Sequence, residues 1–409
     1  MKQLVILGAG TAGTMMANRL VRRLDPALWS IRLVDRDNDH LYQPGLLLVP
    51  FGSYDPRDLV RPRTQFVAPG VELCLAGFER VDPEARQVLL GDGQRISYDI
   101  LVIATGATLQ PELTEGLTGA GWRRNSFDFY TLEGATALAT ALERFEGGRI
   151  VLNVAENPIK CPVAPLEFLF LADAFFQERG RRNKVELIYA TPLEGAFTKP
   201  KASALLGDML SKRNIYVETD FLVSRVDGEA GKIQSWDGRS LPFDLLVEVP
   251  VHGGVEAIRA SGLGDAQGWV PTDPHSLQSK DHPEIFVLGD ATNLPVSKAG
   301  SVAHFQGEVL TENILRYIRD LPLLPDFDGH ANCFIETGHG KAMLIDFNYK
   351  TEPLPGRFPL PGIGPFTLLE ESAVNHWGKL GFRWIYWNML LRGEDLPLDH
   401  RMLLAGKWS

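Results

Sequence analysis

Cysteine is the residue type in this sequence with the richest chemistry, because a thiolate is both a nucleophile and a redox group. The 409-residue chain has three cysteines, Cys74, Cys161 and Cys333, and no CxxC pair. Cys161 follows the apolar run 150–152 and precedes an apolar segment that we expect to form a helix, with Lys160 beside it. A helix N-terminus and a neighbouring ammonium both stabilise a thiolate. The sequence therefore predicts a nucleophile at Cys161, with a buried structural cysteine as the alternative.

A glycine-rich motif near the N-terminus predicts a dinucleotide site. Residues 8–13 read Gly-Ala-Gly-Thr-Ala-Gly, between an apolar run at 4–7 and a helical stretch to about Leu24, and Asp35 follows a second apolar run at 31–34. In such a βαβ unit the glycines let the backbone approach a pyrophosphate at the helix N-terminus, and the acid binds a ribose. The glycines concerned are Gly8, Gly10 and Gly13. A tight turn without a ligand is the alternative.

A second dinucleotide loop would be expected after the predicted helix 131–145 and strand 149–154. The sequence there is Ala-Glu-Asn-Pro, at 155–158, without glycine. Glu156 would repel a pyrophosphate, and Pro158 lacks a backbone donor. We therefore expect no NAD(P)H site.

Composition limits the partners and the location. The net charge of −10 argues against nucleic acid, whose phosphates require a basic face. The length suggests two or three domains. The sequence shows neither an apolar run of about 18 residues nor a signal peptide, so we expect the cytoplasm or its membrane face. No metal site is indicated.

The C-terminal region has an aromatic and basic composition typical of a lipid–water interface. Five aromatic residues lie within 377–387, with Lys379, Arg383 and Arg392 among or after them. They are Trp377, Phe382, Trp384, Tyr386 and Trp387. A dimer interface or a core helix is the alternative. Residues 353–365, with five prolines, are expected to be a linker to this tail.

Two further strand-like segments carry a family resemblance. One, at 98–103, ends in Ala-Thr-Gly with Thr105 and Gly106, and the other, at 285–288, ends in Gly289-Asp290-Ala291. Together with the N-terminal motif they resemble the FAD-binding segments of the two-dinucleotide-domain flavoproteins. The resemblance implies FAD as the cofactor, held in part by these residues, with Asp290 on the ribityl chain.

The implied fold is α/β, with two Rossmann-like domains and a C-terminal amphipathic, membrane-binding helical tail. The FAD domain is discontinuous and comprises 1–110 and 246–330. The second domain, 111–245, carries the first redox cysteine. The C-terminal region, 331–409, carries the second cysteine and the tail.

Residues 161–167, Cys-Pro-Val-Ala-Pro-Leu-Glu, resemble the first redox-cysteine segment of sulfide:quinone oxidoreductases and flavocytochrome c sulfide dehydrogenases. The resemblance implies that Cys333 is the second redox cysteine and Glu167 an acid/base, although a solvated first-turn acid is as good an interpretation of Glu167. Sulfide would attack a disulfide or polysulfide bridge between Cys161 and Cys333. A third cysteine that many members carry is missing from 124–129, and Cys74 is interpreted as structural.

Residues 295–300 resemble the family's V-P-K-T-G segment, which places Lys298 at the flavin, unless it is an exposed loop lysine. Lys341 is a weaker candidate. The tail resembles the membrane-binding tail of sulfide:quinone oxidoreductases.

The expected function is therefore oxidation of sulfide to sulfane sulfur or polysulfide, with two electrons passed to membrane quinone. A sulfur acceptor and the membrane surface are implied partners, peripheral attachment on the cytoplasmic side is the expected location, and a homo-oligomer is compatible. The alternatives are a type II NADH:quinone oxidoreductase, a sulfide dehydrogenase flavin subunit with a cytochrome partner, and a non-catalytic flavin or quinone sensor.

Overall fold

The computed structural model describes residues 1–396 and 398–408, and its first domain is built on a five-stranded parallel sheet. The strand order is β20 (Ile285–Val287), β9 (Ile100–Ile103), β1 (Lys2–Leu7), β2 (Trp29–Val34) and β5 (Val71–Cys74). The central strands are apolar and fully buried, as a parallel sheet covered on both faces requires. Because β20 joins this sheet after a long excursion of the chain, the domain is discontinuous, as predicted.

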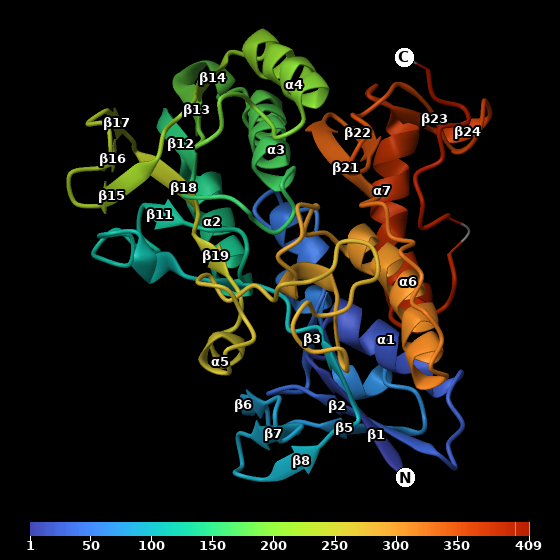
Figure 1. Ribbon diagram of the computed structural model, residues 1–409. Coiled ribbons are helices and arrows are strands. Elements are labelled where there is room, and N and C mark those ends of the chain that lie inside the picture. The colour runs from blue at the N-terminus through green and yellow to red at the C-terminus, as the bar shows by residue number, and fades with distance from the viewer. Residues whose placement is uncertain (397, 409) are drawn as a thin grey trace.

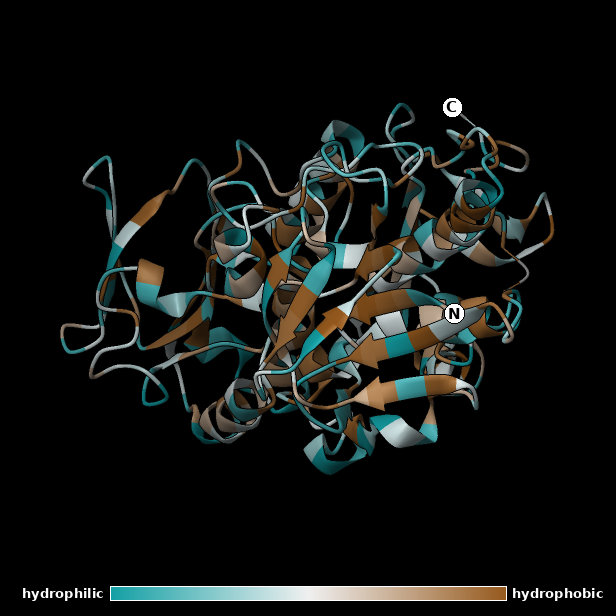
Figure 2. Cartoon of the chain, turned by 60° about the horizontal axis from the view of Figure 1, so that its bottom comes forward, coloured by the Kyte–Doolittle hydropathy of each residue, from teal (hydrophilic) through white to brown (hydrophobic). Residues whose placement is uncertain are grey.

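Helices cover one face of this sheet and a small antiparallel sheet covers the other (Figure 1). The helices are α1 (Thr11–Val21) and α6 (Gly300–Ile318), and the antiparallel strands are β6 (Phe78–Asp82), β7 (Gln87–Leu90) and β8 (Arg95–Ser97). The apolar residues gather in the interior strands, while polar residues occupy the surface loops (Figure 2). The short pair β3 (Asp39–Leu41) and β4 (Val60–Pro62) lies between β2 and β5 in sequence.

The second domain repeats the same plan. Its parallel sheet has the order β11 (Ser126–Phe127), β18 (Leu245–Val249), β12 (Gly148–Val154), β13 (Val185–Ala190) and β14 (Ile215–Glu218). Its helices are α2 (Leu132–Arg144), α3 (Ala164–Glu178) and α4 (Pro200–Lys212), and its antiparallel strands are β15 (Val223–Asp227), β16 (Lys232–Ser235) and β17 (Ser240–Pro242). Because β18 belongs to this sheet, the domain extends past the predicted boundary at 245. Strands β10 (Thr108–Leu109) and β19 (His252–Gly253) pair, and α5 (Glu256–Ala260) follows.

The C-terminal region forms a third unit. Its sheet has the order β21 (Ala331–Gly338), β22 (Lys341–Phe347), β24 (Gly364–Leu368) and β23 (Gly356–Leu360). The segment predicted as a linker therefore contains an antiparallel hairpin, which corrects that expectation.

One amphipathic helix follows this sheet. Ser372 caps α7 (Ala373–Ile385) by accepting a hydrogen bond from the Asn375 N–H at 3.1 Å. A π-helical turn, Tyr386–Leu390, continues it. Among the described residues, no helix has the length and apolar character needed to cross a membrane.

Candidate active site

The N-terminal glycine motif forms a bare backbone turn between β1 and α1. Gly8 is left-handed (φ +95°), and a Cβ there would lie 2.5 Å from the Ala104 carbonyl oxygen. A Cβ on Gly13 would lie 1.8 Å from the Gly8 carbonyl oxygen. Gly10, in contrast, has open space on the side where a Cβ would project. The turn therefore exposes backbone at the N-terminus of α1, which is the arrangement that binds a pyrophosphate.

Asp35 lies at the end of β2 and supports the same turn. One carboxylate oxygen accepts the Ala9 N–H at 2.6 Å, and the other lies 3.3 Å from the Arg63 guanidinium. Arg63 also donates to the Ala9 carbonyl at 2.5 Å. Sequence reasoning missed Arg63, because only the fold brings it to this motif.

The other predicted cofactor residues lie at the carboxyl ends of β9 and β20. Gly106, directly after Thr105, is left-handed (φ +71°) with open space around its would-be Cβ. Gly289 is also left-handed (φ +69°), and its N–H donates to the Gln306 side-chain oxygen at 2.6 Å. The Gln306 amide nitrogen is buried and has no partner among the described residues. A free donor beside a bare turn fits a ligand such as FAD, which has many acceptor atoms.

Lys298 is a buried residue, so it is not an exposed loop lysine. Its ammonium donates to the carbonyls of Asp290 and Thr292, each at 2.8 Å, and lies 3.8 Å from the Trp269 ring centroid. Burial lowers the pKa of Lys298 to about 8, although the Asp290 carboxylate opposes this shift. Burial also raises the pKa of Asp290. The lysine therefore holds the Asp290 loop in place.

Cys161 is attached to this loop through its backbone. It has a left-handed backbone (φ +49°), and its N–H donates to the Lys298 carbonyl at 2.7 Å. The neighbouring Lys160 ammonium binds the Gln43 side-chain oxygen at 3.1 Å. Burial raises the pKa of the Cys161 thiol to about 12; the charge of Glu167 adds to the shift and that of Lys379 opposes it. The expected lowering of this pKa by the α3 N-terminus and Lys160 is therefore wrong in direction, because burial dominates.

Cys333 approaches the same place from β21. It is buried, and β21 packs against α3, the helix that follows Cys161. Burial and then the charge of Cys161 raise the pKa of Cys333 well above its usual range. The fold thus brings two free thiols, 172 residues apart, into one electrostatic environment. Cys74 lies in β5 of the first sheet.

A buried ion pair, Glu167 with Lys379, lies beside the thiols. Glu167 is in the first turn of α3 and is 1% exposed, so it is not a solvated helix acid. One of its oxygens contacts the Lys379 ammonium and accepts the Glu336 N–H, the latter at 2.8 Å. Burial raises the pKa of Glu167, and Lys379 opposes that shift. Sequence reasoning had assigned Lys379 to a lipid-facing patch, but its ammonium points into the protein.

Lys379 is also near a second carboxylate, that of Glu336. Against the effect of burial, the charges of Glu167 and Glu336 raise the pKa of Lys379. The Glu336 carboxylate in turn binds Nδ1 of His376 at 2.9 Å, and His376 is partly exposed. These charged groups therefore extend from the surroundings of the thiols to a partly exposed histidine.

The five aromatic residues of the tail divide into two groups. Trp377 is 69% exposed and Trp384 is 63% exposed, whereas Tyr386 and Trp387 are 1% and 3% exposed. Phe382 is partly buried against the main core. The prediction that all five face a membrane is therefore wrong for Tyr386 and Trp387, which pack among His40, Tyr42 and Phe66 instead. Lys341 is exposed at the start of β22.

Comparisons with known proteins found similar chains and a similar fold. A family model described as pyridine nucleotide-disulphide oxidoreductase matches residues 2–307. The mitochondrial sulfide:quinone oxidoreductase of Mus musculus is 27% identical over 398 residues, covering 96% of this chain and 86% of the relative. The sulfide-quinone reductase of Aquifex aeolicus is 24% identical over 78% of each chain. The crystal structure of the sulfide:quinone oxidoreductase from that bacterium superimposes with a TM-score of 0.78 at 22% identity, covering 96% of this chain and 92% of the other.

Proposed function

Because the chain belongs to the pyridine nucleotide-disulphide oxidoreductase family, we propose that it is an FAD-dependent sulfide:quinone oxidoreductase. The relatives that match over most of their length are sulfide:quinone oxidoreductases, and they indicate sulfide as the substrate and quinone as the acceptor. The observation that carries it is the pair of thiols beside the Glu167–Lys379 ion pair, with Cys161 bonded through its backbone to the lysine that holds the Asp290 loop.

The first chemical step is thiol–disulfide exchange between sulfide and a Cys161–Cys333 disulfide. Hydrosulfide attacks one cysteine sulfur, a new S–S bond gives a persulfide on that cysteine, and the other cysteine leaves as a thiolate. A nucleophilic sulfur acceptor then takes the outer sulfur of the persulfide, which leaves two reduced cysteines. FAD, when bound, supplies the two-electron acceptor that allows the disulfide to form again, and quinone is the final electron acceptor.

In this step Lys379 stabilises negative charge on sulfur, and Glu167 accepts a proton. The Lys379 ammonium is the cation that opposes the high pKa of Cys161, so it stabilises the thiolate that leaves or attacks. Glu167 can take a proton from hydrogen sulfide or a thiol, since burial raises its pKa. The Glu336–His376 contact gives that proton a route toward the surface. Lys298 and Asp290 would hold the cofactor, with Gly8, Gly10 and Gly13 at its pyrophosphate.

The type II NADH:quinone oxidoreductase is the less supported alternative. One relative carries that kind of name, the alternative NAD(P)H-ubiquinone oxidoreductase C1 of Arabidopsis thaliana, at 26% identity over 78% of this chain. In this chain, however, the turn between β12 and α3 presents the exposed Glu156 where a pyrophosphate would bind. A carboxylate at that position disfavours a dinucleotide.

A protein that reduces membrane quinone must contact the lipid surface, and α7 is the element suited to that contact. Its exposed tryptophans, Trp377 and Trp384, lie seven residues apart and so share one face of the helix. Lys379, on the same helix, pairs with Glu167, and its charge acts on both thiols. Peripheral attachment through α7 would therefore place the membrane close to the redox site, and it is part of this proposal.

Anaerobic flavin bleaching tests the function directly. Sulfide added to the purified holoprotein should bleach the flavin absorbance, and decylubiquinone should restore it. The variants Cys161→Ser and Cys333→Ser should each retain FAD but lose bleaching by sulfide. Cys74→Ser is the matched control and should bleach like the wild type. Bleaching by NADH but not by sulfide would refute the proposal in favour of the alternative.

A further inference from the structure

The hydroxyl of Tyr386 joins the C-terminal helix to the start of the nucleotide-binding helix. It lies 2.8 Å from the Thr11 hydroxyl and 2.7 Å from Nε2 of His40, and the tyrosine is 1% exposed. Thr11 is the first residue of α1 and follows Gly10 of the glycine motif directly. Residues 375 positions apart in the sequence therefore meet at the turn that faces the cofactor phosphates.

The N-cap residue of α1 makes no side-chain cap, so contacts from other parts of the chain fix its first turn. The N-cap residue is Gly10, which has no side chain to accept a hydrogen bond. The N–H groups of a helical first turn have no partner within the helix, and they are the groups that bind a phosphate. Their direction depends on how firmly Thr11 is held. Burial lowers the pKa of His40 to about 4, so its imidazole is neutral and serves as a fixed hydrogen-bond partner for the tyrosine hydroxyl.

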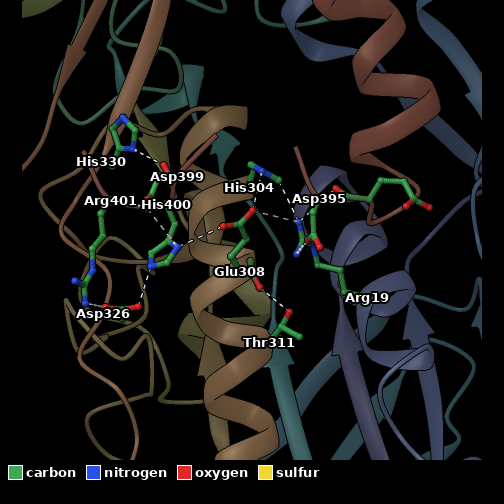
Figure 3. Close-up of polar contacts among 12 residues, drawn as sticks. Arg19, His304, Glu308, Thr311, Asp326, His330, Asp395, Asp399, His400 and Arg401 are labelled. Carbon is green, nitrogen blue, oxygen red and sulfur yellow. Dashed lines mark hydrogen bonds and ion pairs between the residues drawn. The ribbon is translucent and has the colours of Figure 1, made fainter. Parts of the chain in front are cut away.

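The C-terminal segment also holds the second half of α1. The Asn18 amide donates to the Leu391 carbonyl at 2.6 Å. The Arg19 guanidinium binds Asp395 at 2.8 Å (Figure 3). The π-helical turn Tyr386–Leu390 lies between α7 and these contacts. Such turns widen the helix locally and occur often at functional positions. Docking of the C-terminal segment and the position of α1 are thus linked along the whole helix.

We propose that Tyr386 is a positioning residue for FAD: its hydroxyl fixes the first turn of α1, so that FAD binding and docking of the C-terminal helix stabilise each other. The coupling is reciprocal by thermodynamic linkage. A bound FAD holds the helix that carries Lys379 and the exposed tryptophans, and a docked helix retains FAD. The inference rests on FAD as the cofactor and is independent of the electron donor and acceptor.

A titration of the full-length apoprotein with FAD tests whether Tyr386 strengthens FAD binding. Quenching of the flavin fluorescence measures the bound fraction. Loss of a buried hydroxyl contact in Tyr386→Phe should weaken FAD binding about tenfold. Tyr42→Phe is the matched control: Tyr42 is 2% exposed in the same aromatic cluster, and its hydroxyl makes no hydrogen bond within the described part of the chain. It should bind FAD like the wild type.

Substitution of the partner residue provides a second route if Tyr386→Phe fails to fold. Thr11→Val should weaken FAD binding to a similar extent, whereas Thr11→Ser, which keeps the hydroxyl, should retain the affinity. The double variant Thr11→Val with Tyr386→Phe should be no weaker than either single variant, because both remove the same contact. Additive losses would overturn the proposal.

Limited proteolysis measures the reciprocal effect on the tail. In the wild type, FAD should slow cleavage within residues 388–400. The factor should be about the same as the factor by which Tyr386→Phe weakens FAD binding. In Tyr386→Phe, FAD should give little protection. Equal protection in both proteins would overturn the coupling. A protein that shows the coupling but is not bleached by sulfide would contradict the proposed function alone, so the two failures can be distinguished.

Discussion

At the scale of single residues, the main finding is that burial controls the chemistry of the thiols. Burial raises the pKa of Cys161 to about 12 and that of Cys333 well above its usual range, so burial favours the protonated form of both thiols. Lys379, which the tail helix inserts next to Glu167, is the cation that opposes both shifts. A reactive thiol here depends on one cation supplied from another part of the chain.

Lys379→Met should therefore reduce both activity and stability. Without the ammonium, the pKa of Cys161 rises, and each unit lowers the thiolate fraction about tenfold. We expect sulfide bleaching at pH 7 to slow at least about tenfold and its pH profile to shift to higher pH. Removal of one partner of a buried ion pair should also cost about 3 kcal/mol of unfolding free energy.

The double variant Lys379→Met with Glu167→Gln separates these effects. It leaves no unpaired buried charge, so thermal stability should largely return while bleaching stays slow. Lys341→Met removes an exposed lysine and is the control. An unchanged pH profile in Lys379→Met would show that the ammonium does not act on Cys161.

At the scale of elements, two faces of α7 have different surroundings. One face carries Lys379 and His376 to the carboxylates of Glu167 and Glu336, and the other exposes Trp377 and Trp384. The neighbouring β23–β24 hairpin ends in Leu360 and Ile363, which are 55% and 79% exposed. Exposed apolar side chains at a helix and a hairpin tip are typical of an interaction surface.

Removal of the two exposed tryptophans should weaken attachment to lipid. In co-sedimentation with phospholipid vesicles, we expect Trp377→Ala with Trp384→Ala to bind at least about tenfold more weakly, because two large apolar side chains no longer enter the interface. Trp236→Ala is the matched control, since Trp236 is 79% exposed in the second domain. Equal loss in both variants, or no loss, would contradict a membrane role for α7.

At the scale of the whole molecule, charged contacts hold the C-terminal segment against α6. His400 lies 2.8 Å from Asp326 and 3.4 Å from Glu308, and His304 lies 3.2 Å from the same Glu308 (Figure 3). The contact with Glu308 raises the pKa of His400. Against burial, His304 and His400 lower the pKa of Glu308 to about 2. The C-terminal segment is thus held most firmly when His400 is charged.

This cluster predicts a pH-dependent contribution to stability. Because the folded-state pKa of His400 is raised, its contribution is complete below its usual pKa of 6.5 and is lost as the pH rises through the raised value. Glu308 contributes above its usual pKa of 4.5 and loses its contribution as the pH falls toward about 2. In thermal melts, His400→Gln should therefore destabilise the protein at pH 6 and have little effect at pH 9.

The expected loss of unfolding free energy in His400→Gln is below about 1 kcal/mol, since the His400–Glu308 pair is partly exposed. His339→Gln, at an exposed histidine, is the control and should not change the melting temperature at either pH. A loss for His400→Gln that is the same at pH 6 and pH 9 would assign the effect to packing and not to charge.

The sequence by itself determined the local elements and the nucleotide motif. The spacing of Gly8, Gly10, Gly13 and Asp35 and the apolar runs around them specify a βαβ unit, because backbone freedom and strand burial are local properties. The same reasoning located the strands that end at Gly106 and Gly289. It failed at 353–365, where prolines suggested a linker, but the edge strand β23, and the part of β24 that pairs only with β23, tolerate them.

Only the tertiary structure decided which side chains meet. Cys161 and Cys333 share one site because α3 packs on β21, and Lys379 joins them because α7 turns its basic residue inward. Tyr386 is a residue type that is common in membrane anchors, yet its side chain is buried and its hydroxyl contacts Thr11. The residue type sets the polarity of a side chain, whereas the direction in which the side chain points depends on long-range packing. That packing sets both the pKa values and the role of the C-terminal helix.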